Sequence, residues 1–337
     1  MPQGLNLIFG ATRVGNAGWN GIPEKYANDE ATFATFKILK KHNIKHLDTG
    51  RLYGKSEAAL GRYKAGTELG FIIDTKWVGG FFDPSSTTKE RIIVDAKDSL
   101  AKLGILKIHC FSLHSPNMKP GIEDTLDGVN EVYKTGAFEH FGLSNFTTAQ
   151  VREVYDICKA KAFVLPTVYQ GLYNPVNRKQ EEELLPLLRK LGIAFNAYSP
   201  LAGGFLVKSH FDVTNNEGRF NKDTFGGLYN EMYNNGPYLV AHAEWGRIAK
   251  EESITRAALA YRWMNFHSAL KTEFGDGMLL GGRLPQLEEA FEALDQGPLS
   301  DSATESIQKL WEKLQPHVKY AHNLEAQIAV MVAASRS

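Results

Sequence analysis

The chain has 337 residues, of which 43% are hydrophobic and 23% charged, and its basic and acidic residues are equal in number at 38 each. This balance is typical of a globular protein with a sizeable core, and it provides no net charge to attract nucleic acid or an anionic membrane. The two cysteines, Cys110 and Cys158, are too few for a disulfide framework and indicate a reducing compartment. The N-terminal segment lacks the basic region of a signal peptide, and nowhere do about 18 apolar residues follow one another. We therefore expect a cytoplasmic protein without a membrane or nucleic-acid partner.

Eight short apolar runs recur along the chain, and amphipathic stretches separate them. The runs are Leu5–Phe9, Ile44–Leu47, Gly70–Ile73, Ile105–Leu113, Phe138–Leu143, Val164–Val168, Ile193–Ala197 and Met278–Leu280. Strands that alternate with helices indicate βαβ units and a parallel sheet. Eight such strands can close into a (β/α)8 barrel of the TIM type, which is the fold class we predict.

Helical patterns fill several of the gaps, at Ala31–His42, Thr87–Leu103, Ile122–Thr135 and Thr148–Ala160. In the third of these, apolar residues recur at spacings of three and four, as they do on one face of a helix. Capping residues precede three of the helices, at Asn28-Asp29, at Ser86-Thr87 with Glu90, and between Asn145 and Thr148. Gly104 and Gly136 stand where left-handed caps would end two of them.

The alternative fold is an open, doubly wound sheet with a dinucleotide site after its first strand. Such a site usually carries the pattern G-x-G-x-x-G, but Gly10 and Gly15 flank a segment that lacks the middle glycine. The barrel is therefore the favoured interpretation.

No repeat or polar linker divides the chain, so we expect a single domain over residues 1–337. The barrel should cover about residues 5–295, and a helical extension should follow over about 300–337, beginning with a helix at Ser302–His322. One long connection, from Ser209 to about Tyr238, is rich in Asn, Gly and Asp and shows no obvious structure. Loops of this length are usually functional or mobile.

Polar side chains follow three successive apolar runs, at the strand ends where a barrel forms its active site. Asp48 and Tyr53 follow the second run, Lys76 follows the third, and His114 follows the fourth. Each residue alone has an ordinary structural explanation, such as a cap, a packed ring, a solvated charge or a core histidine. Their occurrence together favours catalysis.

Reduction of a carbonyl group explains why these four residue types belong together. The reaction needs a hydride and a proton for the developing alkoxide. Tyr53 can donate the proton if the ammonium group of Lys76 stabilises the phenolate and lowers its pKa, and Asp48 can hold Lys76 in place. His114 can donate a hydrogen bond to the carbonyl oxygen. We expect no metal in this scheme.

With this tetrad the chain resembles an aldo-keto reductase, and the resemblance extends from Leu5 to about Tyr320. Matching segments include Gly142–Phe146, Pro166–Asn174 and Ser199–Leu206. The segments Gly218-Arg219-Phe220 and Ala258–Met264 resemble the aflatoxin-aldehyde and succinic-semialdehyde reductase branch. The resemblance implies NADP(H) as cofactor, a small-molecule carbonyl substrate and, since relatives often dimerise, a possible homodimer.

The resemblance also assigns cofactor residues. Ser144, Asn145 and Gln170 match the positions that bind the nicotinamide carboxamide, and Tyr198 matches the residue beside the ring. The glycine-containing segment after Ser199, with Leu201 and Gly203, would let backbone amides approach the pyrophosphate, with Lys208 just beyond it. The turn after the last strand would bind the adenosine and its 2′-phosphate through Gly282, Arg283, Gln286 and Glu289, while Arg219 would serve the cofactor or the loop.

The substrate side departs from the semialdehyde reductases. Gly236 stands where those relatives place an arginine that binds the substrate carboxylate. The remaining wall is aromatic, and we expect Trp19, Trp77, Phe146 and Tyr233, together with His114, to contact a neutral, bulky or aromatic carbonyl compound. The alternative function is a non-catalytic regulatory subunit that senses NADPH, because the same fold also serves channel-associated subunits.

Overall fold

The computed structural model describes residues 4–16, 27–79, 88–116, 121–215, 220–222 and 227–318. Its eight strands are all parallel and close into a barrel in the order of the chain, with β1 paired to both β2 and β8. This confirms the predicted (β/α)8 fold and excludes the open sheet. The strands are β1 (Asn6–Gly10), β2 (His46–Asp48), β3 (Ile72–Trp77), β4 (Ile108–Leu113), β5 (Phe138–Ser144), β6 (Pro166–Leu172), β7 (Ala194–Tyr198) and β8 (Gly277–Leu280).

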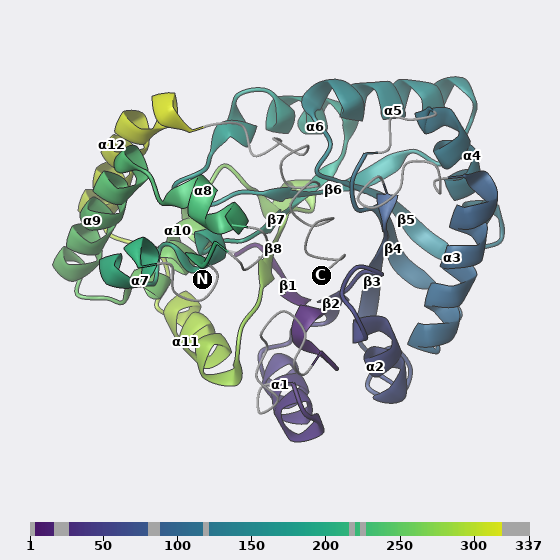
Figure 1. The fold of residues 1–337 in the computed structure, drawn as a ribbon, viewed down its shortest axis with the longest axis horizontal. Coiled ribbons are helices and arrows are strands. Elements are labelled where there is room, and N and C mark those ends of the chain that lie inside the picture. Colours follow the sequence, from purple (N-terminus) through teal and green to yellow (C-terminus); the bar gives the residue numbers. More distant parts are fainter. Residues whose placement is uncertain are drawn as a thin grey trace.

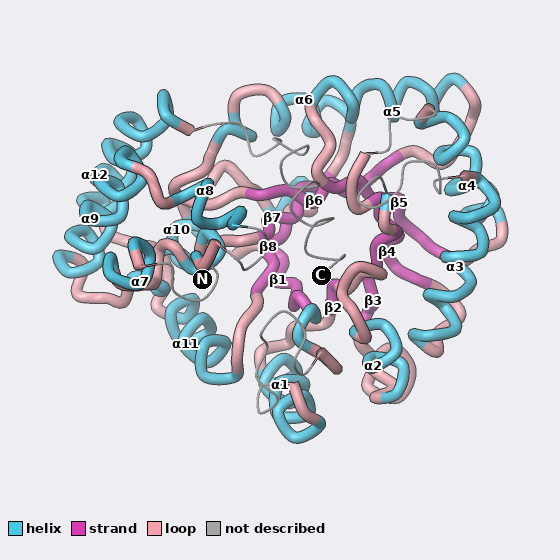
Figure 2. The backbone as a smooth tube through the Cα atoms, viewed as in Figure 1, coloured by secondary structure: helices cyan, strands magenta, loops and turns pink. Residues whose placement is uncertain are grey.

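Helices surround the barrel as an outer ring (Figure 1, Figure 2). They are α1 (Asp29–Lys41), α2 (Ser56–Arg62), α3 (Lys89–Leu103), α4 (Ile122–Lys134), α5 (Thr148–Ala160), α6 (Leu184–Leu191), α7 (His210–Thr214), α8 (Leu228–Tyr233), α9 (Gly236–Glu251), α10 (Arg256–Phe266), α11 (Leu284–Asp295) and α12 (Asp301–Leu314). Their apolar faces cover the outer face of the sheet and form a continuous core with it. The barrel interior, in contrast, holds the polar and charged residues described below.

The predicted helix ends are largely confirmed. Asn28 caps α1 by accepting a hydrogen bond from the amide of Ala31 at 2.9 Å. Thr147 and Gln150 form a reciprocal capping box at the start of α5. Gly104 ends α3 in the left-handed conformation, with φ of 64°. For α3 the cap is Thr88, while Ser86 and Thr87 lie outside the described residues.

The segment from Ser209 to Tyr238 differs from the prediction. It contains the short helices α7 and α8 and the first turn of α9, so it is not a structureless loop. Ser209 caps α7 through a capping box with Asp212, a local signal that the overall polar composition concealed. Residues 216–219 and 223–226 lie outside the described part of the chain.

The predicted C-terminal helix is present but shorter than expected. It ends at Leu314 and is followed by a 3-10 turn over Gln315–His317, and it packs against α9. The rest of the proposed extension, residues 319–337, lies outside the described part of the chain. Among the described residues, none of the helices combines the length and apolar character that a membrane crossing would require.

Candidate active site

The four residues of the predicted tetrad lie together at the carboxyl end of the barrel strands. Asp48 is the last residue of β2, Lys76 lies near the end of β3, and His114 directly follows β4. Tyr53 lies in the turn after β2, where its amide donates to the carbonyl oxygen of Gly50 at 2.9 Å. The parallel pairing of β2 with β3 and of β3 with β4 brings the four side chains to one mouth.

Lys76 and Asp48 form a buried ion pair at this mouth. The ammonium Nζ donates to Asp48 Oδ2 at 2.6 Å and to the carbonyl oxygen of Thr49 at 2.8 Å. Only 1% of the Lys76 side chain and 4% of the Asp48 side chain are exposed. Gln170 Nε2 donates to the other carboxylate oxygen, Asp48 Oδ1, at 2.9 Å. Each oxygen of the Asp48 carboxylate thus accepts a hydrogen bond, and a buried ion pair is stable only with such additional hydrogen bonds.

Tyr53 lies between the Lys76 ammonium group and His114. Lys76 Nζ is 5.0 Å from the centre of the Tyr53 ring. The rings of Tyr53 and His114 meet edge to face, with centres 5.5 Å apart and planes at 86°. Burial raises the pKa of the Tyr53 phenol above its ordinary value, and the charge of Lys76 offsets only part of this rise. The expected net lowering of the pKa is therefore absent, because desolvation outweighs the ammonium charge in this closed site.

The protonation states that follow suit a proton donor. Burial alone would lower the pKa of Lys76, but the negative charge of Asp48 raises it above its ordinary value, so Lys76 stays charged. Burial, aided by the positive charge of Lys76, holds the pKa of His114 well below its ordinary value. His114 is therefore a neutral imidazole at neutral pH, able to donate one hydrogen bond without carrying charge.

The residues expected around a nicotinamide ring join the same network. Asn145, in the left-handed conformation with φ of 63°, donates from Nδ2 to the His114 carbonyl oxygen at 2.9 Å and to Ser144 Oγ at 3.2 Å. Tyr198 donates its hydroxyl proton to Asn145 Oδ1 at 2.9 Å. Gln170, from β6, joins the group through Asp48. The structure thus places Ser144, Asn145, Gln170 and Tyr198 on the rim that holds the tetrad.

The segment after β7 contains residues in the left-handed backbone region. Ser199 and Gly203 both have positive φ, at 56° and 68°. A side chain at Gly203 would meet Tyr229 Cε1 at 2.1 Å, so glycine is required there. Leu201 precedes this turn and is half-buried, as is Lys208, whose carbonyl oxygen lies 2.9 Å from His242 Nε2.

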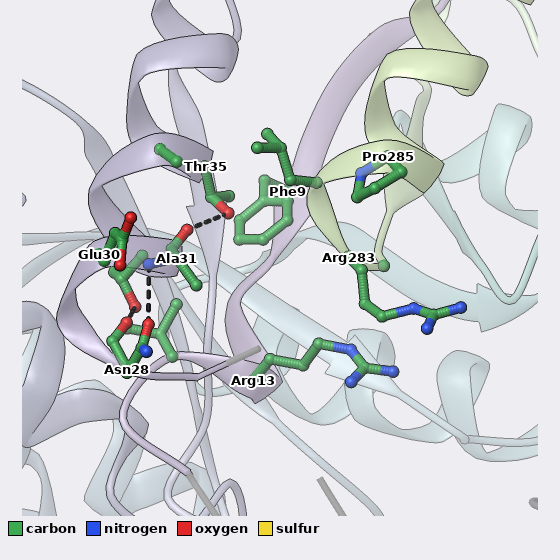
Figure 3. A pocket seen from close by; sticks show the side chains of 13 residues that line it. Phe9, Arg13, Asn28, Glu30, Ala31, Thr35, Arg283 and Pro285 are labelled. Carbon is green, nitrogen blue, oxygen red and sulfur yellow. Dashed lines mark hydrogen bonds between the residues drawn. The ribbon is translucent and has the colours of Figure 1, made fainter. Parts of the chain in front are cut away.

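The turn between β8 and α11 borders a cavity of about 380 Å³ (Figure 3). Gly282 and Arg283 line one side, and Arg13, which follows β1, lines the other. In Figure 3 the two arginine side chains extend in the same direction from these sides. Gln286 Oε1 accepts from the amide of Arg283 at 2.9 Å, which fixes the start of α11. The sequence did not lead us to predict Arg13 at this cavity. Its position shortly after the first strand, where barrel sites form, could have indicated it.

Glu289, the last of the predicted adenosine contacts, is placed differently. Its Oε1 accepts a hydrogen bond from Thr255 Oγ1 at 2.8 Å, and it is not among the residues that line the cavity. The geometry links Glu289 to the start of α10 instead.

Three of the predicted substrate contacts are core residues. Trp77 is 2% exposed and donates from Nε1 to Asp95 Oδ2 of α3 at 3.0 Å, so it faces the helices and not the barrel interior. This argues against a substrate contact, and we leave Trp77 out of the site. Phe146 and Tyr233 are fully buried, and Tyr233 stacks on Phe205 with ring centres 5.0 Å apart. Trp19 and Arg219 lie outside the described residues.

Comparison with known proteins identifies the family to which the chain is similar. The model of the aldo/keto reductase family matches residues 6–312. "Oxidoreductase sirO" of Leptosphaeria maculans is 36% identical over 279 residues, which cover 82% of this chain and 84% of that protein. "Aflatoxin B1 aldehyde reductase member 2" of Rattus norvegicus is 35% identical over 304 residues, covering 83% and 80%. "Aldo-keto reductase family 7 member A3" of Homo sapiens is 34% identical over 285 residues, covering 79% and 84%.

Proposed function

Because this chain belongs to the aldo/keto reductase family, we propose that it reduces a neutral carbonyl compound with NADPH and that Tyr53 donates the proton. The observation that carries this proposal is the buried ion pair between Lys76 and Asp48 beside the Tyr53 ring. A charged ammonium group in a closed site is costly unless it is paired. Its position next to a tyrosine is explained if that tyrosine must become an anion.

Each tetrad residue has a distinct role in this proposal. The bound cofactor supplies the hydride. Tyr53 carries its proton up to the moment of reaction and releases it to the substrate oxygen, and Lys76 stabilises the phenolate that remains. Asp48 positions Lys76 through the 2.6 Å contact. His114, kept neutral by burial, donates a hydrogen bond that orients the carbonyl oxygen and stabilises the charge that develops on it.

The residues of the rim fit a nicotinamide cofactor. Ser144, Asn145 and Gln170 supply hydroxyl and amide groups of the kind that a carboxamide pairs with. The positive-φ backbone at Ser199 and Gly203 exposes peptide groups where a pyrophosphate would lie. We assign these residues to the nicotinamide half and the diphosphate, with Tyr198 beside the ring and Lys208 near the phosphates.

We assign NADPH in preference to NADH because of the cavity beside α11. Arg13 and Arg283 bring two positive charges to its walls, and the cavity opens next to the amino end of a helix. A 2′-phosphate is the group of the cofactor that would gain from both features. Gly282 and Gln286 then shape the turn that receives the adenosine.

The substrate preference rests on the position of Gly236. It is the exposed first residue of α9, and it contributes no charge where semialdehyde reductases are expected to carry an arginine. A carboxylate that loses its hydration needs a cationic partner. We therefore assign a neutral aldehyde or ketone, bulky or aromatic, as the substrate class.

The direct test measures NADPH binding and NADPH consumption side by side on the full chain. We expect saturable NADPH binding, seen by quenching of tryptophan fluorescence, and oxidation of NADPH with 4-nitrobenzaldehyde or 9,10-phenanthrenequinone. Binding without turnover across a panel of carbonyl compounds would favour the regulatory subunit and contradict the catalytic proposal.

A further inference from the structure

A cluster of histidines surrounds one carboxylate, with its members drawn from four neighbouring strands. His46 begins β2, Asp74 lies in β3, His109 in β4 and His140 in β5. These strands are adjacent in the barrel, and Asp74 pairs in register with Cys110, which pairs with His140. Asp74 is in register with Asp48 and lies two residues before Lys76, so the cluster adjoins the tetrad along the strands, but none of its residues has a role in the proposed reaction.

The contacts within the cluster converge on Asp74. His109 Nδ1 is 2.7 Å from Asp74 Oδ1, and His46 Nδ1 is 3.8 Å from Asp74 Oδ2, so each carboxylate oxygen faces a different imidazole. The rings of His46 and His109 meet edge to face with centres 4.9 Å apart. His140 lies beyond them, its ring centre also 4.9 Å from that of His109.

One histidine would be enough to satisfy a buried carboxylate by hydrogen bonding. Here the second imidazole, His46, approaches the other oxygen without reaching hydrogen-bond distance. One nitrogen from each of His46 and His109 and one oxygen from Asp74 lie within 4.8 Å of one another. The side chain of Asp74 is 10% exposed, whereas those of His46 and His109 are 30% and 28% exposed. The carboxylate is therefore buried in the barrel, and the two imidazoles are accessible to solvent.

We propose that His46, Asp74 and His109 form a binding site for a divalent transition-metal ion of the zinc class. Two imidazoles and one carboxylate are a donor set that zinc binds, with bond lengths of about 2.0–2.2 Å and neighbouring ligand atoms therefore roughly 3.3–3.6 Å apart. The three donor atoms are already within reach of that spacing, and small rotations of the two half-exposed imidazoles complete it. Water from the open side fills the remaining position.

The neighbouring groups support this choice of ligands. Glu139 and His140 form a second group with His109, but Glu139 is exposed and already paired with Lys107 at 2.9 Å. Cys110 is buried and does not belong to either group of potential metal ligands. The set of His46, Asp74 and His109 therefore combines the less exposed of the two carboxylates with two partly exposed imidazoles.

This site was not predicted from the sequence, because its histidines are 63 positions apart, from 46 to 109, and only the pairing of β2 with β3 and of β3 with β4 brings them together. To group these residues, one would have to know which positions lie level with one another on neighbouring strands. Metal binding can be measured without cofactor or substrate, so its outcome does not depend on the cofactor proposal.

The test is a titration of the full chain, without an affinity tag and stripped with a chelator, with zinc chloride in a calorimeter. We expect one saturable site and a higher melting temperature in the presence of zinc, because an ion that binds only the folded state stabilises it. Cobalt chloride should give visible absorption bands that report imidazole and carboxylate coordination. His46→Gln and His109→Gln should each weaken binding at least ~10-fold, by the scale that metal sites show for lost supporting groups.

His317→Gln is the matched control, since this exposed histidine lies in the 3-10 turn after α12, outside the cluster, and its loss should leave the affinity unchanged. Circular dichroism of each variant establishes that the fold is kept. If a glutamine variant fails to fold, X-ray absorption of the zinc-loaded wild type decides, with two imidazoles and one carboxylate expected. No saturable binding by the wild type, or wild-type affinity in both cluster variants, would overturn the proposal.

Discussion

Lys76 Nζ lies 5.0 Å from the centre of the Tyr53 ring while it is held by Asp48 at 2.6 Å. The charge that would stabilise a phenolate is therefore in place before the proton leaves, and its position depends on β2 and β3, two paired strands of the barrel. Preorganised charge of this kind needs no rearrangement when the reaction occurs.

Replacing Tyr53 with phenylalanine removes the proton donor and keeps the ring. Turnover should fall at least ~100-fold, the scale typical of general acid catalysis, while NADPH affinity changes little. Steady-state kinetics and a fluorescence titration measure the two quantities. General acid catalysis contributes ~100-fold or more. If the variant keeps more than about a tenth of wild-type turnover, Tyr53 is not the proton donor.

Replacing Asp48 with asparagine leaves Lys76 buried beside a neutral amide. Breaking a buried pair from one side typically costs about 3–5 kcal/mol of unfolding free energy, and urea denaturation measures it. The control is Glu131→Gln, which breaks the exposed pair with Lys134 and should cost at most about 1 kcal/mol. Equal effects of the two variants would mean that the Asp48–Lys76 pair is not closed to solvent.

His114 predicts how stability responds to acid. Its pKa in the folded state lies well below the ordinary value, so the unfolded chain binds a proton that the folded chain does not. Stability then falls as the pH drops through the ordinary histidine value of about 6.5. His114→Gln should lose less stability than the wild type between about pH 7 and pH 5. Urea denaturation at both pH values checks this, and identical pH slopes would contradict it.

Much of the site could be predicted because a barrel converts strand order into spatial order. The ends of successive strands meet at one face, so Asp48, Lys76 and His114 could be grouped without coordinates. The alternation of side chains along a strand could also have corrected Trp77, since a neighbour of the inward-facing Lys76 must face outward. The net rise in the Tyr53 pKa could not be predicted, because it depends on how completely the mouth is closed.

We expect the preference for NADPH over NADH to depend on Arg283. Arg283→Ala should weaken NADPH about 10- to 100-fold, the equivalent of a charge-assisted hydrogen bond of roughly 1.5–3 kcal/mol, and should leave NADH nearly unchanged. Arg13→Ala should act in the same direction, because both arginines line the same cavity. Titrations with both cofactors measure the difference. Equal weakening of NADPH and NADH by Arg283→Ala would place the 2′-phosphate elsewhere.

Gly236 predicts the substrate class. A carboxylate substrate loses hydration free energy on binding, and without a cation at this position nothing offsets that cost. Succinic semialdehyde should therefore be a poor substrate and a neutral aromatic aldehyde a good one. The site can accept a larger residue, because a Cβ added to Gly236 meets nothing within 4 Å. Gly236→Arg should improve succinic semialdehyde selectively and mostly through KM, since the added contact binds ground and transition states alike. Gly236→Gln is the matched control, which adds length without charge and should leave the preference unchanged. Steady-state kinetics on both substrates decides the question: a wild-type kcat/KM for succinic semialdehyde at or above that for the neutral aldehyde would contradict the assigned substrate class.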